Sequence, residues 1–392
     1  MDHPIPQGAT LGMLGGGQLG RMFADAAQAL DYRVHVFCPE DNCPAAQVAD
    51  EHTQASYDDL DAVSKFAASV AVVTYEFENV PAATAAACAA HAPVRPGENV
   101  LRIAQDRIRE KKTLREHGIP VAPFAAVHTE DDLHQATQTI GLPGVLKTSG
   151  GGYDGKGQRI LRGTADLTYA WEDLGRVPCV YEALVDFEQE VSVVAARSAG
   201  GEVQCFGPIA NTHRNHILDV SVVPSGAPQS VEDQAVAIAT KVMNDLEVVG
   251  VLCVEFFQVR PLAGEISGGM LVNELAPRPH NSGHLTIEAF NASQFEQQVR
   301  AVCGLPLVQL ERKSPAAMAN LLGDLWPQAG GEPDWSAIAA DGLHLHLYGK
   351  SAARPGRKMG HLTALARTPH EAIRDAVEAR TRLAPRNPLS PD

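Results

Sequence analysis

The sequence predicts a mixed α/β and α+β protein, in which a doubly wound α/β domain is followed by a region rich in strands. One observation behind this prediction is a strand, glycine turn, helix and second strand within residues 10–37. The other is a succession of short apolar strands, broken by few helices, from about residue 143 onward. The first pattern is typical of a parallel, doubly wound sheet, and the second is typical of an α+β domain.

The opening segment predicts a βαβ unit. An apolar strand at residues 10–14 leads into Gly-Gly-Gly-Gln-Leu-Gly at residues 15–20, and an amphipathic helix is expected over residues 22–30. Further strands are expected at residues 33–37 and 70–74. Because glycines occur where a strand must turn sharply into a helix, about the first hundred residues are predicted to form the α/β domain.

A helix and the strand-rich region come next. Asp106 is the expected N-cap of a helix that runs to Glu116, with Gly118 just past its end. A second helix is expected over residues 230–245, and a last one near residues 369–381. Strands are predicted at residues 144–148, 158–162, 179–184, 191–196, 251–259, 271–275 and 343–348.

Composition excludes several classes of function. The chain of 392 residues carries a net charge of −15, which disfavours a nucleic-acid surface but leaves room for local anion sites. Its seven cysteines are dispersed without a C-x-x-C pair, a pattern that predicts reduced cytosolic thiols. There is no leader-like opening, and no apolar run approaches about 18 residues. We therefore expect a soluble, cytoplasmic protein that binds neither nucleic acid nor membrane.

The first glycine motif, Gly15-x-Gly17-x-x-Gly20, fits the dinucleotide fingerprint, with Glu40 or Asp41 about twenty residues later. Taken alone, the motif would suggest a nicotinamide cofactor. Any ligand that carries a phosphate can use a glycine turn at a helix N-terminus, and the turn can also be purely structural. The motif leaves these three interpretations open.

The second glycine motif, Gly-Gly-Gly-Tyr-Asp-Gly-Lys-Gly at residues 150–157, nearly satisfies the P-loop pattern. Gly157 stands where a P-loop needs a hydroxyl residue, and the chain continues as a strand rather than a helix. Lys147 lies at the end of the preceding strand. A glycine-rich loop between strands favours a flap over ATP phosphates, because backbone N–H groups approach closely where no Cβ intervenes. The alternative is a hairpin tip that binds no ligand.

Two glutamates, Glu255 and Glu274, occur within apolar strands. If the chain folds back as a hairpin centred near residues 264–265, their side chains face each other. Like charges opposite each other on a sheet are destabilising unless something neutralises them. A magnesium ion that bridges ATP phosphates would do so, since it is bound by a few carboxylates and by phosphate oxygens. The alternative is a pair of glutamates that point to solvent.

A loop stiffened by prolines follows the second glutamate. It presents Arg278, His280 and Asn281, which are suitable donors to a small oxyanion. His280 and His284 could instead form a metal pair, but the prolines make a regular helix unfavourable there.

Residues 342–370 contain no aspartate or glutamate, although the chain has 47 acidic residues. They contain Lys350, Arg354, Arg357 and Lys358. A local basic loop in an acidic protein suits a phosphate monoester, while a solvated surface loop is the alternative. Nucleic acid is disfavoured, because no aromatic residues interleave these charges.

Together with Tyr-Glu-Phe-Glu-Asn-Val at residues 75–80, these motifs resemble ATP-grasp enzymes, and among them the 5-(carboxyamino)imidazole ribonucleotide synthetase family. The resemblance runs from about Gly12 to Leu362. It implies an N-terminal domain over residues 1–105, an ATP-grasp domain over 106–303 with a lid at about 120–185, and a C-terminal domain over 304–392. It also implies ATP and Mg²⁺ as cofactors and a homodimer.

The resemblance further implies roles for individual residues. Catalytic roles fall to Asp154, Arg278, His280 and Asn281, and magnesium ligation to Glu255 and Glu274. Whether His213 or His216 contacts the nucleotide stays open. Aminoimidazole ribonucleotide would bind at Gln18, Leu19, Glu76, Tyr153, Asp154, Lys350 and Arg357. ATP would bind at Arg107, Lys147, Gly152, Tyr153, Asp154, Gly155, Lys156, Gly157, Gln158, Glu182, Ala183, Leu184, Val185, Glu190, His213, Asn273 and Glu274.

The implied reaction begins when ATP phosphorylates bicarbonate. The amine of aminoimidazole ribonucleotide then captures carboxyphosphate, or carbon dioxide released from it. A formate-dependent glycinamide ribonucleotide transformylase would use similar machinery. An NAD-dependent oxidoreductase would explain only the first glycine motif, and a non-catalytic nucleotide-binding module would not require both apparent magnesium carboxylates.

Overall fold

An all-parallel sheet forms the first part of the chain in the computed structural model, which describes residues 3–151, 155–260, 269–327 and 330–383. Its strand order is β3-β2-β1-β4, as expected of a doubly wound fold. The helix α1 (Gln18–Gln28) begins directly after the glycine turn, four residues earlier than predicted. The strands are β1 (Thr10–Leu14), β2 (Arg33–Cys38), β3 (Glu51–Gln54) and β4 (Val73–Tyr75).

Helix α2 (Leu60–Ala68) lies between β3 and β4. Three further helices lead from this sheet to the next one: α3 (Ala82–Ala89), α4 (Glu98–Ala104) and α5 (Arg107–Glu116). Asp106 caps α5 as predicted, because its side chain accepts a hydrogen bond of 2.8 Å from the backbone N–H of Arg109. Gly118 then takes a positive φ of 67° past the helix end, as the predicted helix stop requires.

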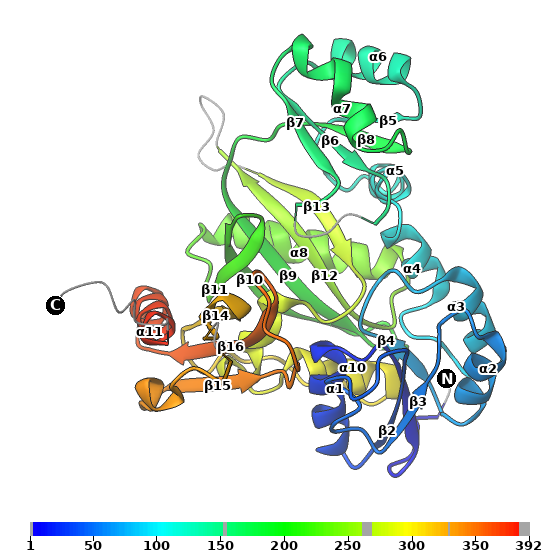
Figure 1. Cartoon of the computed structure of the whole chain (residues 1–392), viewed down its shortest axis with the longest axis vertical. Coiled ribbons are helices and arrows are strands. Elements are labelled where there is room, and N and C mark those ends of the chain that lie inside the picture. Colours follow the sequence, from blue (N-terminus) through cyan, green and yellow to red (C-terminus); the bar gives the residue numbers. More distant parts are fainter. Residues whose placement is uncertain (1–2, 152–154, 261–268, 328–329, 384–392) are drawn as a thin grey trace.

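A small antiparallel sheet of order β5-β8-β6-β7 lies apart from the N-terminal sheet, at the top of Figure 1. It occupies the predicted lid region and is covered by α6 (Glu130–Ile140) and α7 (Leu167–Asp173). Its strands are β5 (Phe124–Val127), β6 (Gly144–Thr148), β7 (Gln158–Leu161) and β8 (Cys179–Ala183).

An eight-stranded antiparallel sheet forms the centre of the molecule, in the order β13-β12-β9-β10-β11-β14-β16-β15. The strands from the middle of the chain are β9 (Phe187–Arg197), β10 (Val203–Arg214), β11 (Ile217–Val223), β12 (Gly250–Val259) and β13 (Met270–Ala276). The helices α8 (Gln229–Asp245) and α10 (Gln294–Cys303) pack against β9 and β12. Short turns η2 (Asn281–Leu285) and α9 (Thr286–Ala289) precede α10.

The C-terminal segment extends this same sheet. Strand β14 (Ala316–Leu322) pairs with β11, and β16 (Lys358–Leu365) and β15 (Leu343–Leu347) follow it outward. Helix α11 (Pro369–Arg382) covers them, at the lower left of Figure 1. The predicted boundary at residue 304 is therefore not a break in the sheet. No helix among the described residues is both long and apolar enough to cross a membrane.

Candidate active site

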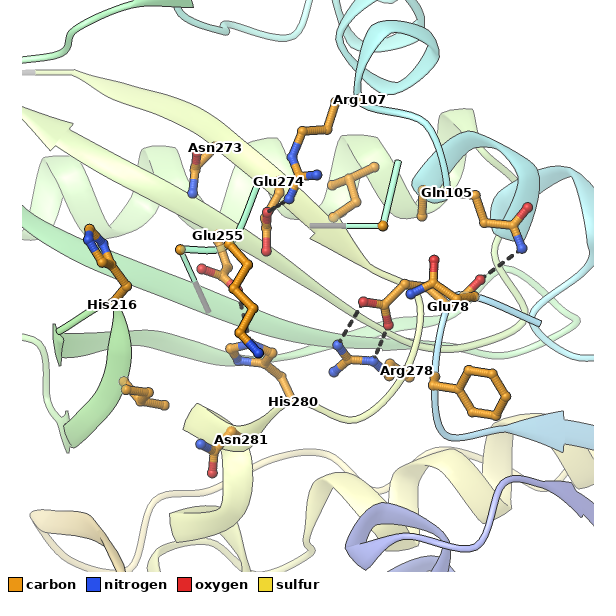
Figure 2. Close-up of a pocket in the computed structure, with 18 of the residues that line it drawn as sticks. Glu78, Gln105, Arg107, His216, Glu255, Asn273, Glu274, Arg278, His280 and Asn281 are labelled. Atoms are coloured by element: carbon orange, nitrogen blue, oxygen red, sulfur yellow. Dashed lines mark hydrogen bonds and ion pairs between the residues drawn. The ribbon is translucent and has the colours of Figure 1, made fainter. Parts of the chain in front are cut away.

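A cavity of about 520 Å³ receives side chains from all three sheets (Figure 2). The N-terminal sheet contributes the start of α1 and the end of β4, and the small sheet contributes β6, β7 and the glycine flap. The large sheet contributes β9, β10, β12, β13 and the loop after β13. Of the predicted site residues, those that line the cavity are Gln18, Leu19, Glu76, Arg107, Lys147, Gly155, Lys156, Gln158, Glu190, His213, Asn273, Glu255, Glu274, Arg278, His280 and Asn281.

The two glutamates face each other as predicted. Glu255 on β12 is the register partner of Glu274 on β13, beside an irregularity in the pairing. Burial and the charge of Glu255 raise the pKa of Glu274. Burial works to raise the pKa of Glu255 too, but the charge and hydrogen bond of His280, together with the charges of His213 and Arg278, lower that pKa. The turn expected at residues 264–265 lies outside the described residues.

This part of the cavity suits a hard cation. Besides the two carboxylates, the Oδ1 atom of Asn273 is buried without a hydrogen-bond partner among the described residues. Such oxygen donors are the ligands that magnesium prefers. A divalent cation would also relieve the repulsion that raises the pKa of Glu274.

Basic side chains from α5 and β6 pair with two glutamates, Glu274 and Glu182. Arg107 Nη2 lies 3.5 Å from Glu274 Oε2. Lys147 Nζ and Lys111 Nζ lie 3.2 and 3.3 Å from the two oxygens of Glu182. Burial works to raise the pKa of Glu182, but the two ammonium groups outweigh it and lower that pKa. In this structure Glu182 is thus held between lysines.

The end of β8 does not reach this cavity within the described part of the chain. Ala183, Leu184 and Val185, predicted to contact the nucleotide, are not among its lining residues, and neither is Glu182. Gly157 does not line it either, although its carbonyl accepts the Thr148 N–H at 2.8 Å at the base of the flap. Gly152, Tyr153 and Asp154 fall outside the described residues.

The loop after β13 turns its donors toward acidic partners. The guanidinium of Arg278 donates two hydrogen bonds, of 2.6 and 3.2 Å, to the carboxylate of Glu78. His280 Nε2 lies 2.9 Å from Glu255 Oε1. Asn281 is buried, and both atoms of its amide lack a hydrogen-bond partner among the described residues. The guanidinium, imidazole and amide therefore gather beside the paired glutamates.

The suggested metal pair of His280 and His284 does not form. His280 contacts Glu255, whereas His284 is fully buried, with its Nδ1 3.2 Å from the amide nitrogen of Gln294. The ring of His284 packs against those of Phe295 and His361. The two imidazoles therefore belong to different surroundings, and the oxyanion interpretation of the loop is the one that the geometry favours.

Glu76 fills the first glycine turn. Its carboxylate accepts hydrogen bonds from the backbone N–H groups of Gly17 and Gly20, the second at 2.8 Å. A Cβ at Gly17 would lie 2.7 Å from Glu76 Oε1, and one at Gly15 would also clash with this side chain. A protein carboxylate thus occupies the place where a dinucleotide pyrophosphate would bind. This observation disfavours the nicotinamide interpretation.

Both candidate histidines of the nucleotide region line the cavity. His213 Nδ1 pairs with Glu190. Burial works to lower the pKa of this histidine, but the hydrogen bond and charge of Glu190, together with the charge of Glu255, raise it. His216 packs against the flap, where a Cβ at Gly155 would clash with its ring. His213 is therefore held by a residue of β9 in the large sheet, while His216 contacts the flap.

The basic loop reaches the cavity through Lys358. Lys350 Nζ donates to the carbonyl of Lys358 at 2.7 Å, and Arg357 Nη1 donates to the carbonyl of Ala352 at 2.8 Å. Burial and the neighbouring charge of Arg357 lower the pKa of Lys350 to about 8. Lys350 and Arg357 stand next to the described cavity rather than in its lining, and they form the cationic cluster that the sequence predicts.

Four functional candidates escaped the sequence prediction. Glu78 and Lys111 pair with predicted site residues, and Gln294 bonds the loop that carries His280. Glu110 lines the cavity, and burial raises its pKa to about 8. Only Glu78 carries a signal, because it lies in the motif at residues 75–80.

Comparison with known proteins decides the family. An N5-carboxyaminoimidazole ribonucleotide synthase of Bacillus subtilis strain 168 is 41% identical over 371 residues, which cover 95% of each chain. The chain belongs to the N5-carboxyaminoimidazole ribonucleotide synthase family. Family models match the ribonucleotide synthetase preATP-grasp domain at residues 8–105, the ATP-grasp domain at 112–295 and the phosphoribosylaminoimidazole carboxylase C-terminal domain at 316–375. The predicted three-domain ATP-grasp architecture is confirmed.

Solved structures of the family agree with this fold. An ADP complex of an N5-carboxyaminoimidazole ribonucleotide synthetase superposes with a TM-score of 0.89 at 40% identity, over 97% of this chain and 98% of that one. An Aspergillus clavatus enzyme in complex with ADP and 5-aminoimidazole ribonucleotide gives 0.85 at 30% identity, over 96% and 99% of the two chains.

Proposed function

We propose that this chain is an ATP-dependent carbon–nitrogen ligase of purine biosynthesis. It attaches bicarbonate to 5-aminoimidazole ribonucleotide and releases ADP and phosphate. The observation that carries the proposal is the meeting of paired carboxylates, Glu255 and Glu274, with the oxyanion donors Arg278, His280 and Asn281 in one cavity. The solved family member that contains ADP and the aminoimidazole nucleotide supports both substrates.

ATP lies between the small sheet and the large one in this proposal. Lys147 and Arg107 neutralise phosphate oxygens, and the flap at residues 155–158 covers them with backbone N–H groups. Glu190 on β9 accepts hydrogen bonds from the ribose hydroxyls. Glu182 and the end of β8 contact the adenine, which requires the small sheet to move relative to this structure.

Magnesium fits beside the paired glutamates, with Glu255, Glu274 and Asn273 as the candidate ligands. When bound, the ion supplies positive charge to the phosphate oxygens during transfer. Arg107 Nη2 lies 3.5 Å from Glu274 Oε2 and would help to orient this carboxylate for the ion.

The donors of the loop after β13 activate the small acid. Bicarbonate is a poor electrophile, and its phosphorylation converts a hydroxide leaving group into phosphate. Arg278 and Asn281 hold the oxygens of the anion and of the carboxyphosphate made from it, because charge-assisted and amide N–H groups bind such oxygens well. His280 donates from an imidazole that Glu255 orients at 2.9 Å.

The amine acceptor binds on the side of the N-terminal sheet. Its phosphate is held by Lys350 and Arg357, and its ring lies against Gln18, Leu19 and Glu76. Because Glu76 is fixed by two backbone N–H groups, its position is set by the glycine turn. Tyr153 and Asp154 of the flap complete this part of the proposal. Closure of the flap over both substrates excludes water from carboxyphosphate.

The decisive experiment measures ADP release with each acceptor in the presence and absence of the small acid. We expect bicarbonate-dependent release with aminoimidazole ribonucleotide, and little or none with formate and glycinamide ribonucleotide. Formate lacks the third oxygen of bicarbonate, and leaving one buried donor unpaired costs about 1–3 kcal/mol, which corresponds to about 5- to 150-fold. Efficient turnover of the formate pair would overturn the proposal. Cytoplasmic location and a homodimer remain predictions, to be checked by fractionation and by light scattering.

A further inference from the structure

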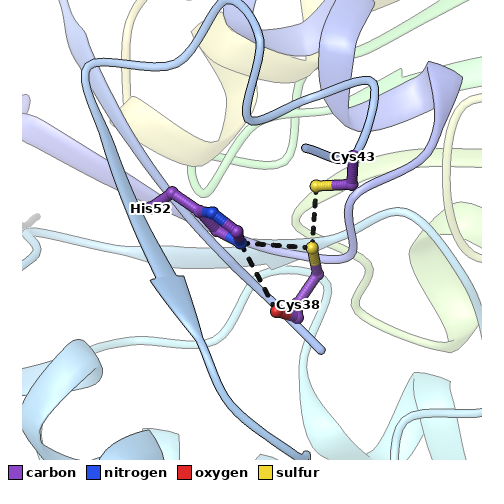
Figure 3. A group of neighbouring side chains, drawn as sticks. All are labelled: Cys38, Cys43 and His52. Carbon is purple, nitrogen blue, oxygen red and sulfur yellow. Dashed lines mark hydrogen bonds between the residues drawn. The ribbon is translucent and has the colours of Figure 1, made fainter. Parts of the chain in front are cut away.

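Two cysteines and a histidine meet behind the first glycine turn (Figure 3). Cys38 ends β2, Cys43 lies in the loop that follows, and His52 lies on the neighbouring strand β3. The two sulfur atoms are 2.7 Å apart, and His52 Nε2 lies 3.4 Å from the sulfur of Cys38. Among the described residues, this is the one group of three or more potential ligands whose donor atoms all lie within 4.8 Å of one another.

The group is built into the fold rather than spread on the surface. Cys38 and Cys43 are buried, and His52 is partly exposed and gives access from solvent. Gly16 closes the other side, where any Cβ would clash with both sulfur atoms. The reaction proposed above uses none of these three side chains.

The donor set points to a thiophilic cation. Two thiolates and one imidazole suit zinc, and four residues separate Cys38 from Cys43, within the spacing common among zinc ligands. Zinc bonds of about 2.3 Å to sulfur and about 2.0 Å to nitrogen place tetrahedral ligands roughly 3.5–3.8 Å apart. The distance of 3.4 Å between Cys38 Sγ and His52 Nε2 is about 0.1 Å below this range, and the two sulfur atoms, 2.7 Å apart, must separate by about 1 Å.

We propose that Cys38, Cys43 and His52 form a binding site for Zn²⁺ or a chemically similar divalent cation, with a fourth coordination position open to solvent. Binding converts both thiols to thiolates and releases two protons, so that the ion and its three ligands carry no net charge. The site is separate from the predicted magnesium site, whose candidate ligands are oxygen atoms.

Metal binding at this site should change the geometry of the cavity through the glycine turn. A Cβ at Gly16 would clash with both sulfur atoms, so the turn leaves no free space beside them, while the backbone N–H of the neighbouring Gly17 donates to Glu76. Separation of the sulfurs therefore displaces the turn that fixes Glu76 at the acceptor side of the cavity. Occupation of the site should raise the KM for aminoimidazole ribonucleotide several-fold and leave that for ATP unchanged. This second part rests on the proposed function.

The test for binding uses Co²⁺ as a spectroscopic substitute for zinc on the reduced, full-length protein. Thiolate ligation gives sulfur-to-cobalt charge-transfer absorption, which oxygen ligands at the magnesium site do not give. We expect this absorption to saturate at one equivalent and to disappear on addition of one equivalent of Zn²⁺. Cys38→Ser and Cys43→Ser should each lose it, and His52→Asn should shift its saturation to higher cobalt concentration.

Cys88→Ser is the matched control, because Cys88 is equally buried but lies in the core on α3, apart from the group. It should keep the full charge-transfer absorption. Absence of this absorption in the wild-type protein, or its persistence in Cys43→Ser, would overturn the proposal. These readouts need no turnover, so failure of the proposed enzyme activity would not affect them. An unchanged KM for the acceptor in zinc-loaded protein would contradict the coupling to Glu76.

Discussion

Glu255 and Glu274 place two partly exposed carboxylates opposite each other, which is unfavourable without a cation between them. Glu274→Gln removes one charge at nearly constant shape. We expect ATP turnover to fall by orders of magnitude while the fold persists, because a magnesium ligand is weakened and the repulsion is relieved. ADP release at saturating magnesium, together with thermal unfolding, checks this. Undiminished release would remove the glutamates from the metal site.

Glu110 predicts a pH dependence of stability. Burial raises its pKa from 4.5 to about 8, and its Oε1 atom has no hydrogen-bond partner among the described residues. The folded state therefore holds this proton at pH values where the unfolded state has lost it. The contribution of the group is complete below about pH 4.5 and is lost as the pH rises toward 8, with a slope of at most about 1.4 kcal/mol per pH unit.

Glu110→Gln tests this prediction, because an amide oxygen can still accept the hydrogen bond from Leu275 N–H. The difference in free energy of unfolding, variant minus wild type, should be more positive at pH 8 than at pH 5. Denaturant unfolding of both proteins without nucleotide or magnesium gives the difference at each pH. An equal difference at the two pH values would mean that Glu110 titrates normally.

At the scale of elements, α10 holds the oxyanion loop in position. The fully buried amide of Gln294 accepts from the His280 N–H at 2.9 Å and donates to the His280 carbonyl at 2.8 Å. Gln294→Leu leaves both backbone groups unpaired, at about 1–3 kcal/mol each. We expect the KM for bicarbonate to rise and bicarbonate-dependent ADP formation to fall at least ten-fold.

Gln297 on the same helix supplies the control. It bonds the backbone of Val308 in the same two-sided way, at 3.0 and 2.7 Å, and neither residue lines the cavity. Gln297→Leu should cost similar stability without changing the KM for bicarbonate. Equal kinetic effects of the two variants would mean that Gln294 acts through general stability rather than by positioning His280.

The sequence predicted elements best where local chemistry decides them. The glycine turn, the Asp106 cap and the apolar strands that carry Glu255 and Glu274 all appear as expected. Strand β14 was missed, because alanine, methionine and leucine favour helices and only its pairing with β11 and β16 makes it a strand. The polar strand β3 was missed because it lies at a sheet edge and lacks apolar alternation.

The site residues, like the elements, could be predicted only where a short segment of sequence determines them. Opposed glutamates and a basic loop follow from patterns within short segments. The bonds of Arg278 to Glu78 and of Lys111 to Glu182 join residues far apart in the chain, and no spacing in the sequence announces them. In α5, the stretch Arg-Ile-Arg-Glu-Lys-Lys resembles a solvated helix, yet Glu110 and Lys111 are buried, and Glu110 lines the cavity.

At the scale of the whole molecule, the predicted ATP-grasp and C-terminal domains share the large sheet. Strand β14 buries Ala317 and Ala319 in one core cluster and Ala316 and Met318 in another. A chain that ends at Lys313 would expose both clusters and the edge of β11. We expect it to be insoluble or to lack a cooperative thermal transition, unlike the full-length chain. A soluble fragment that unfolds cooperatively would show that residues 1–313 fold alone.

The order of strands in this sheet also constrains how the chain can fold while the ribosome makes it. Strand β11 leaves the ribosome well before β14, and β12 and β13 are added at the opposite edge in between. The nascent chain therefore carries an open, apolar edge at β11 until β14 arrives to cover it. Such an edge is a site for pairing with other chains. The demand for protection by chaperones should thus be greatest while residues 224–315 are being synthesised.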